Sequence, residues 1–399
     1  MKVLAIETSC DESAVCIIEA AGVFGPDFKF SIRGNALNSQ AALHAQYGGV
    51  FPNVAKREHA KALVPLTEKA LRNAGLLQPA TAPTSGATFV ALNATLNREP
   101  ELLAAIIPFL TRYARPNIDA IAVTHGPGLE PALWVGINFA QALSAVWNIP
   151  IVPVNHMEGH IVLPMIDFVN QSSLKLTAFE FPLLSLLISG GHTELVLSKS
   201  FGHYEVIGQT RDDAAGEAFD KVARLLGLPY PGGPEISRLS TLSRERDEMT
   251  SHRISLPRPM IHDKNFDFSF SGLKTAVRNL VGERELNEME KSEIAREFED
   301  AVSDVLVAKT MRAIDEYGVN TLVVGGGVSA NTHIRAQLAA ACKLQAVSCQ
   351  LLVPPPELAT DNAIMIALAG YFHVLNKNFA RPDSLVARGN LSLSEKVSF

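Results

Sequence analysis

The sequence predicts an α/β protein made of two similar halves, each built around a mixed sheet. Short apolar runs of strand length alternate with longer segments of helical periodicity along most of the chain. Each half begins with two adjacent strand-like runs, which indicate a β-hairpin, and then continues with strands separated by helices. The length of 399 residues exceeds what a single hydrophobic core usually organises, so two domains are expected.

The first half contains the elements that this pattern requires, followed by a short strand. In chain order we expect a hairpin, a helix, a strand, a helix and a strand at residues 3–8 with 14–19, 56–74, 118–124, 131–147 and 151–154. Residues 78–100 are rich in Ala, Thr, Pro and Asn, and a helix is expected over residues 101–114. We interpret residues 78–116 as a surface insertion rather than part of the chemistry.

The second half repeats the pattern after a linker near residues 167–180. Its strands are expected at residues 183–189, 193–198, 204–210, 321–324 and 350–353. Its helices are expected at residues 214–226, 293–317, 331–342 and 360–371. The expected first domain is therefore residues 1–155, completed by residues 372–399, and the second is residues 156–371. A ligand is expected between the halves, where the loops at the strand ends converge.

Composition excludes several classes of protein. With 47% hydrophobic and 19% charged residues, the chain is expected to be globular rather than disordered. Its net charge of −6 gives no overall nucleic-acid signature, so RNA binding would depend on local patches. The basic candidates are Lys221, Arg224, Arg238, Arg244, Arg246, Arg253, Arg258 and Lys274. An ordinary solvated surface explains them equally well, because acidic residues are interspersed.

The expected location is the cytoplasm, without a membrane anchor. No apolar run approaches the length of a membrane span, and a strand pattern that begins by Val3 leaves no room for a signal peptide. The four cysteines form no C-x-x-C pair, which favours free thiols in a reducing compartment.

The most informative motif is the pentapeptide HMEGH at residues 156–160. On a helix, the i, i+4 spacing places both imidazoles on one face, close enough to share a metal ion. Asn155 stands where an N-cap is expected, and Glu158 stands at the capping-box position. Because such histidine pairs also occur in helices without a metal, the motif requires a third ligand elsewhere in the chain.

Four carboxylates are candidates for chemistry in addition to capping or solvation. Asp361 lies beside a helix start that follows a proline run, and it is the natural third ligand if that helix end faces the histidines. Asp11 and Glu12 lie in the turn of the first hairpin. Asp220 lies on an amphipathic helix, where an exposed charge is the simpler interpretation.

Four glycine-bearing turns favour a nucleotide site when they are taken together. They lie at residues 126–128, 189–193, 231–234 and 325–331. Small residues let backbone N–H groups approach a phosphate, especially where a turn opens a helix. Residues 325–330 also match G-x-G-x-x-A, but no carboxylate precedes Glu357 near the end of the next strand. A dinucleotide-dependent dehydrogenase is therefore disfavoured.

A metallopeptidase is disfavoured on geometric grounds. The zincin signature H-E-x-x-H places the base directly after the first histidine, and Met157 occupies that place here. Glu158 comes one residue later, about 100° around the helix, and would point away from a metal held by the histidines.

The sequence closely resembles the family of tRNA threonylcarbamoyladenosine synthases, formerly described as O-sialoglycoprotein endopeptidases. The matching stretches are residues 6–12, 126–128, 156–160, 189–193, 212–221, 230–234, 266–274, 325–331 and 360–362. They occur in family order and cover almost the whole chain, apart from residues 78–116 and about the last twenty. The resemblance implies a duplicated actin/hexokinase/Hsp70-like ATPase (ASKHA) fold, with two mixed-sheet domains that face a cleft.

The implied reaction transfers the threonylcarbamoyl group from threonylcarbamoyl-AMP to the N6 amine of adenosine 37 in tRNAs reading ANN codons, releasing AMP. The resemblance implies one divalent metal ion, Fe²⁺ favoured over Zn²⁺, with His156, His160 and Asp361 as ligands. The implied substrate contacts are Leu187, Ile188, Ser189, Gly190, Gly191, Asp220, Gly233 and Asn331. At the position of Leu187 some archaeal relatives carry a metal-ligating tyrosine, so substrate or water is expected to complete the ligand shell.

The residue that acts on the amine stays open, and the family resemblance implies several partners. Asp11 or Glu12 is expected to orient or deprotonate the attacking amine. Bacterial members of the family act with a catalytically inactive paralogue and a P-loop ATPase, which are the expected partners besides tRNA. An ATPase or small-molecule kinase of the same fold remains the alternative, with a metallopeptidase less favoured.

Overall fold

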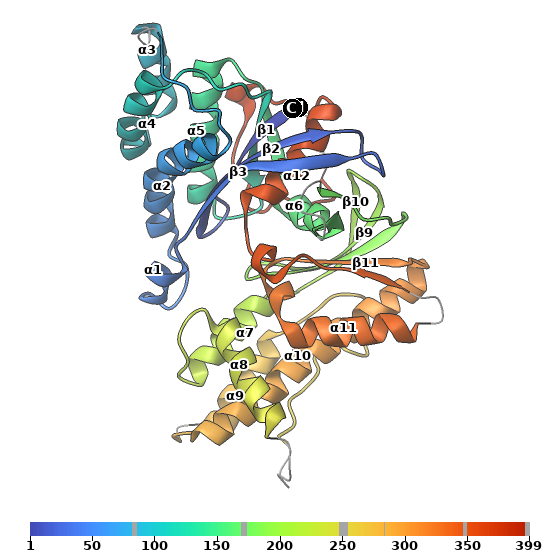
Figure 1. Cartoon of the computed structure of the whole chain (residues 1–399). Helices are drawn as coiled ribbons and strands as arrows, with labels where there is room; N and C mark the ends of the chain where they lie inside the picture. Colours follow the sequence, from blue (N-terminus) through green and yellow to red (C-terminus); the bar gives the residue numbers. More distant parts are fainter. Residues whose placement is uncertain (82–85, 169–173, 247–253, 283, 346–348, 396–399) are drawn as a thin grey trace. The chain divides into compact units, whose positions relative to one another are not determined.

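The computed structural model describes residues 1–399 apart from residues 82–85, 169–173, 247–253, 283, 346–348 and 396–399 (Figure 1). The chain forms two compact units. Unit 1 comprises Met1–Ala178 and Asp361–Phe399, and unit 2 comprises Phe179–Thr360. The expected boundaries differ from these, because residues 156–178 and 361–371 belong to unit 1. The helices in these two segments, α6 (His156–Val162) and α12 (Ala363–Leu375), contact each other and the strands of that unit.

Unit 1 contains a seven-stranded mixed sheet in the order β5-β4-β1-β2-β3-β7-β6. Its strands are β1 (Lys2–Glu7), β2 (Glu12–Ala21), β3 (Lys29–Ser39), β4 (Ala120–Gly126), β5 (Ile151–Asn155), β6 (Ile166–Asp167) and β7 (Leu174–Leu176). The predicted hairpin is confirmed, since β1 pairs antiparallel with β2, while β4 pairs parallel with both β1 and β5. The strand β3 was not expected. Its alternation is interrupted by Gly34 and its polar positions dilute the apolar signal.

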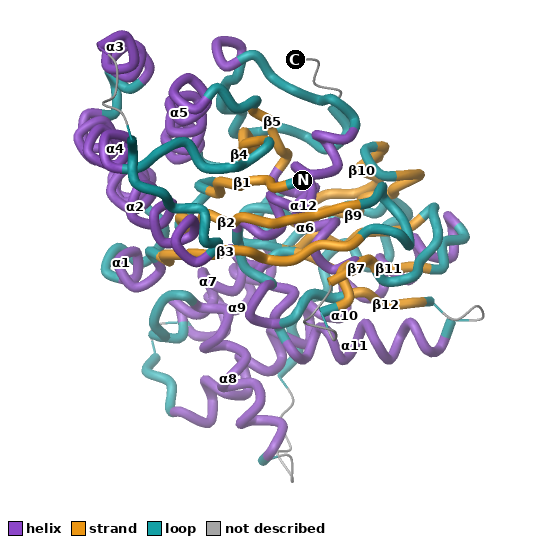
Figure 2. Tube along the Cα trace, turned by 45° about the horizontal axis from the view of Figure 1, so that its top comes forward, coloured by secondary structure: helices purple, strands orange, loops and turns teal. Residues whose placement is uncertain are grey.

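Helices cover both faces of this sheet (Figure 2). Both faces need cover because successive side chains of β1 point to opposite faces and most of them are apolar. Leu4 and Ile6 point into a core shared with α2 (Pro52–Asn73) and α5 (Glu130–Trp147). The opposite face is covered by α12, where Gly370 lies so close to Ala122 that an added Cβ would stand 2.4 Å from the alanine Cβ. Because α6 and α12 contact each other, the two helix starts come together in this unit.

The insertion forms ordered helices in its described part. It contains α3 (Gly86–Thr95), which was not predicted, and α4 (Pro100–Arg112), which was expected. Figure 1 shows both at the outer edge of the unit, beyond α2 and α5. Leu92, Leu96 and Ile106 are buried in the core shared with those helices. A polar cavity of about 320 Å³ lies between the insertion and α2 and α5, and Lys56 pairs there with Glu99 at 2.9 Å.

Unit 2 contains a five-stranded mixed sheet in the order β10-β9-β8-β11-β12. Its strands are β8 (Leu183–Ile188), β9 (Thr193–Ser200), β10 (His203–Gln209), β11 (Thr321–Gly325) and β12 (Gln350–Leu352). Its helices are α7 (Ala215–Leu225), α8 (Gly232–Glu245), α9 (Ser271–Val281), α10 (Glu288–Tyr317) and α11 (Thr332–Leu344). The prediction did not include α8 and α9. The β8–β9 hairpin and the parallel β8–β11 pair reproduce the hairpin-first pattern of unit 1.

Local signals explain where the longest helix of unit 2 begins. Asn287 caps α10 by accepting hydrogen bonds from the backbone N–H groups of Met289 and Glu290. The Glu290 side chain in turn accepts a hydrogen bond from the Asn287 N–H. This reciprocal capping box satisfies donors that the first turn of a helix leaves free. Among the helices in the described residues, none is long and apolar enough to cross a bilayer.

Candidate active site

The histidine helix forms as the sequence predicted. The Asn155 side chain caps α6 by accepting a hydrogen bond from the Met157 N–H at 2.9 Å. His156 and His160 then lie on one face of the helix, with ring centroids 4.7 Å apart and ring planes at 89°. Both rings are buried.

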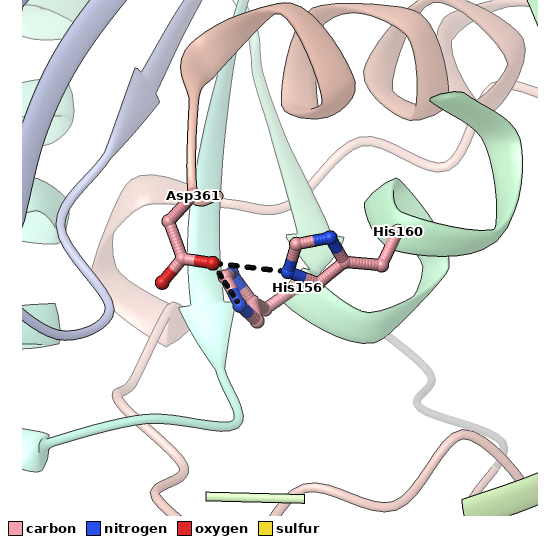
Figure 3. A group of neighbouring side chains, drawn as sticks. All are labelled: His156, His160 and Asp361. Carbon is pink, nitrogen blue, oxygen red and sulfur yellow. Dashed lines mark hydrogen bonds and ion pairs between the residues drawn. The ribbon is translucent and has the colours of Figure 1, made fainter. Parts of the chain in front are cut away.

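Asp361 reaches this histidine pair from a segment 201 residues farther along the chain. Asn362, rather than Asp361, caps α12 by accepting hydrogen bonds from Ile364 N and Met365 N. The Asp361 carboxylate is therefore available for the histidines. Its Oδ1 lies 3.0 Å from His160 Nε2 and 3.3 Å from His156 Nε2, and Figure 3 shows both contacts.

These three side chains have the chemistry and spacing of a metal site. One potential ligand atom from each residue can be chosen so that all lie within 4.8 Å of one another. Two imidazole nitrogens and one carboxylate suit Fe²⁺ or Zn²⁺ and leave coordination positions for a substrate. The fold thus brings the three predicted residues together, while their role as metal ligands and the nature of the ion stay predictions.

Glu7 was not among the predicted site residues. It orients the His156 ring by contacting Nδ1, the ring nitrogen that does not face Asp361. It is fully buried at the end of β1, and its Oε2 lies 3.1 Å from His156 Nδ1. Thr124 Oγ1 donates to the same oxygen at 2.6 Å, and Ser9 N donates to Oε1 at 2.5 Å. A carboxylate that accepts from Nδ1–H leaves Nε2 free for an ion, the usual arrangement behind a metal-binding histidine. An acidic residue inside an apolar strand was the available signal.

Electrostatics couples these buried groups. Burial alone would lower the pKa of His156, but the carboxylates of Asp361 and Glu7 outweigh it and raise that pKa well above its usual value. Burial likewise opposes ionisation of Asp361, yet His156 and His160 hold the pKa of Asp361 well below its usual value. Binding of a metal ion at Nε2 would require this nitrogen to be unprotonated, so it would compete with protonation of His156.

Glu158 does not point into the histidine site. Its Oε2 lies 2.5 Å from His373 Nε2 on α12, and the carboxylate is buried. This is the direction that the 100° offset on the helix predicts. A base for peptide hydrolysis would need to face the metal ligands, so the position of Glu158 disfavours a metallopeptidase.

The turn with Asp11 and Glu12 lies beside the metal candidates. Ser9, at the start of that turn, has its Oγ 3.5 Å from Asp361 Oδ2. Burial raises the pKa of Glu12 to about 9, and the negative charges of Asp361 and Asp11 add to this effect. The Gly-Pro-Gly turn packs against the same segment, because Gly128, with φ +153°, approaches the Ser9 carbonyl too closely for a larger residue.

The predicted substrate contacts lie in unit 2, several of them at the end of β8. Ser189 Oγ accepts hydrogen bonds from Gly191 N at 3.3 Å and His192 N at 3.0 Å, which fixes the glycine turn. Leu187 and Ile188 are buried strand residues that lead into that turn. Gly326, with φ +88°, follows the neighbouring strand and approaches the Ile188 carbonyl too closely for a side chain.

Asp220 and Asn331 hold backbone segments in unit 2. Asp220 Oδ1 accepts a hydrogen bond from Gly232 N at 2.7 Å, so it fixes the start of α8 beside Gly233. Asn331 caps α11 by accepting from Ile334 N at 2.9 Å. Its amide nitrogen donates to Glu299 Oε1 at 2.7 Å, a buried carboxylate that the sequence did not single out.

Much of the basic stretch proposed as an RNA surface is engaged in ion pairs. Lys221 pairs with Asp213 at 2.6 Å and Glu217 at 2.7 Å. Further pairs involve Arg238 with Glu235, Arg244 with Glu299 and Asp300, and Arg258 with Glu297 and Asp304. Arg253 lies outside the described residues. Pairing with carboxylates within the unit reduces the positive potential available to phosphates.

Known proteins resemble this chain along most of its length. The family model for tRNA N6-adenosine threonylcarbamoyltransferase matches residues 31–80 and 110–368. A tRNA N6-adenosine threonylcarbamoyltransferase from Chromobacterium violaceum is 41% identical over 387 residues, which cover 96% of this chain and 95% of that protein. Among solved structures, full-length HypF in a phosphate- and nucleotide-bound form is similar, with a TM-score of 0.50 and 14% identity. That match covers 94% of this chain and 55% of HypF.

These matches agree with the organisation of the chain. The expected actin/hexokinase/Hsp70-like ATPase fold is confirmed, with two mixed-sheet units that each contain a hairpin beside parallel strands. Residues 81–109 lie outside the family match and inside the segment that we interpreted as an insertion.

Proposed function

The chain belongs to the tRNA N6-adenosine threonylcarbamoyltransferase family and is a transferase, and we propose the following reaction for it. The N6 amine of adenosine 37, in tRNAs reading ANN codons, attacks the carbamoyl carbon of threonylcarbamoyl-AMP. The bond from that carbon to the phosphate oxygen breaks, AMP leaves, and the amine loses a proton. The observation that carries this proposal is the convergence of His156, His160 and Asp361 in a chain with these relatives.

The three converging residues would hold a divalent ion, with Fe²⁺ favoured and Zn²⁺ as the alternative. Such an ion would polarise the carbonyl or neutralise the phosphate of the mixed anhydride. The protein contributes the orientation of its ligands. Glu7 keeps the Nδ1 proton on His156 and so directs Nε2 toward Asp361.

The leaving AMP would be held by the turns of unit 2. The turn at Gly190 and Gly191 has room for a phosphate because neither residue carries a side chain, and the Gly191 N–H would exchange its hydrogen bond to Ser189 Oγ for one to the phosphate. Asp220 and Asn331 would act mainly by fixing the backbone at Gly233 and at the start of α11, since hydrogen bonds within the unit already engage their side chains.

Glu12 is proposed to act on the amine. With a pKa of about 9 its carboxyl carries a proton at neutral pH in the state described. A protonated carboxyl can donate a hydrogen bond and so orient a reacting group, and it becomes a base only after it loses that proton. We therefore propose that Glu12 orients the amine through this proton and, once it has lost that proton, accepts the one that the amine releases, with Asp11 beside it in the turn.

Replacing Glu12 by Gln is expected to lower kcat by about 10²-fold while the KM for the adenylate changes little, because a glutamine cannot exchange a proton. The measurement is steady-state formation of modified nucleoside at varied adenylate. Glu19→Gln is the matched control, since Glu19 lies at the surface on the same strand. Unchanged turnover in Glu12→Gln would remove Glu12 from the mechanism.

The proposed function predicts a specific chemical phenotype. Cells depleted of this protein should lose threonylcarbamoyladenosine from tRNAs reading ANN codons, and the wild-type chain should restore it. Nucleoside mass spectrometry of purified tRNA measures this directly. Persistence of the modified nucleoside after verified depletion would contradict the proposal. ATP turnover with a small-molecule acceptor and without tRNA would instead support the kinase alternative.

The remaining partners are proposed on the same basis. In the cytoplasm the chain would act with tRNA, with an inactive paralogue and with a P-loop ATPase. Extensive ion pairing in the basic stretch of unit 2 favours sharing RNA contacts with such partners. Omitting each partner from a reconstituted reaction measures its contribution.

A further inference from the structure

A buried histidine outside the metal site contacts the turn that carries Asp11 and Glu12. His59 lies on α2 and is fully buried. Its Nε2 lies 3.0 Å from the backbone carbonyl oxygen of Cys10, and its Nδ1 lies 2.7 Å from Ser13 Oγ. The two ring nitrogens thus contact both sides of the β1–β2 turn, which spans the residues between these strands.

His59 belongs to a continuous series of hydrogen bonds that runs from the Phe51 N–H to the Cys10 carbonyl. The groups at its two ends fix the direction of each hydrogen bond. At one end Phe51 N can only donate, and it donates to His44 Nδ1 at 3.3 Å. His44 Nε2 therefore donates to Gln40 Oε1 at 3.1 Å, which turns the amide nitrogen of Gln40 toward His59 Nδ1 at 3.4 Å. At the other end the Cys10 carbonyl can only accept, so His59 Nε2 carries the proton.

One protonation state satisfies this chain. The neutral imidazole with hydrogen on Nε2 donates to Cys10 O and accepts from Ser13 and Gln40 at Nδ1. A doubly protonated ring would place an N–H against the Gln40 amide N–H. Burial lowers the pKa of His59, which opposes that charged form even though Glu7 and Asp11 favour it electrostatically.

The same contacts determine where the turn lies. Gln40 N donates to the Asp11 carbonyl at 2.9 Å, so this segment holds the turn at a second point. Ser9, one residue before Cys10, lies 3.5 Å from Asp361 through its hydroxyl. A shift at the Cys10 carbonyl would therefore move Asp11 and Glu12 relative to the metal candidates.

We propose that His59 is a positioning residue for the transfer reaction: its Nε2–H holds the Cys10 carbonyl and thereby fixes Asp11 and Glu12 beside Asp361. This inference rests on the proposed function. The residue touches neither substrate nor ion in this role. It acts through the backbone of the turn, and small displacements of reacting groups are costly to catalysis.

Two substitutions of His59 test the contacts of its two ring nitrogens separately. The amide of a glutamine reaches about as far as Nε2 and can still donate to Cys10 O. The amide of an asparagine reaches only about as far as Nδ1, so it can bond Ser13 or Gln40 but loses the carbonyl of Cys10. Both variants remove the ring from the same buried site, so loss of packing alone affects them similarly.

The test compares His59→Gln and His59→Asn in the full-length chain with its partners. We expect His59→Asn to lower kcat by about tenfold to a hundredfold with little change in KM, and His59→Gln to recover most of the loss. Hydrogen exchange of a peptide spanning residues 7–14 should accelerate in His59→Asn and remain slower in His59→Gln. His203→Asn, at an exposed site in unit 2, controls for the loss of a histidine.

The two readouts distinguish failure of this inference from failure of the proposed function. Equal loss of kcat in both variants, or normal kcat and exchange in His59→Asn, overturns the positioning role. If the wild-type chain forms no modified nucleoside, the proposed function fails. Hydrogen exchange then still decides whether His59 holds the turn, because that measurement does not depend on activity.

Discussion

Replacing His160 by Ala is expected to reduce threonylcarbamoyl transfer by roughly 10³-fold or more, since a bound cation supplies several kcal/mol of transition-state stabilisation. His160 is buried, and its Nε2 lies 3.0 Å from Asp361. Without it, His156 and Asp361 would provide only two of the three proposed ligands, fewer than open catalytic sites typically use. Metal content should fall from about one equivalent to near zero.

The measurement combines metal analysis of the purified protein with single-turnover transfer at saturating adenylate. His203→Ala is a suitable control, because that histidine lies at the surface of unit 2. Thermal unfolding checks that the variant remains folded, since a buried ring leaves a cavity when it is removed. Full metal content and normal transfer in His160→Ala would exclude this residue as a ligand.

The sequence could predict the histidine half of this site because the signal is local. The i, i+4 spacing and the cap at Asn155 are both contained in a few residues, and the structure has them as expected. Asp361 is 201 residues from His160, and its approach depends on α12 covering the same face of the sheet as α6. Only a candidate could be named there, because helix packing of this kind leaves no periodic pattern in the chain.

The prediction missed some helices and strands because their local sequence resembles another kind of structure. The segment Gly232-Gly233-Pro234 looks like a turn, yet it forms the first turn of α8, where proline lacks only a donor that the helix does not use. The strand β3 gives a weak apolar signal because its inward positions after Ile32 carry only the small residues Gly34 and Ala36. The expected boundary after residue 155 differs from that of the structure, because α6 follows β5 there without a linker and packs on the strands of unit 1.

Glu7 carries a local sequence signal, but its role depends on tertiary contacts. Its replacement is the second substitution for which we expect a large effect. Its position in an apolar strand signals a buried charge, but only the fold shows which groups it serves. All three neighbours, Ser9 N, Thr124 Oγ1 and His156 Nδ1, act as donors toward it. A carboxylate can accept from all three, whereas an amide must turn its own N–H groups toward at least one of them.

Replacing Glu7 by Gln should therefore weaken metal binding by about 10- to 100-fold, the usual cost of losing a carboxylate behind a ligating histidine. An amide N–H facing His156 Nδ1 favours the tautomer with hydrogen on Nε2, the atom that we propose binds the ion. Competition with a chelator measures the affinity, and the transfer rate should recover at high metal concentration.

Glu158→Gln is the matched control, because Glu158 is also buried and also bonds a histidine, His373, away from the site. Both variants should lose stability, but only Glu7→Gln should lose metal affinity. Equal affinities in the two variants would show that Glu7 serves the fold and not the metal site.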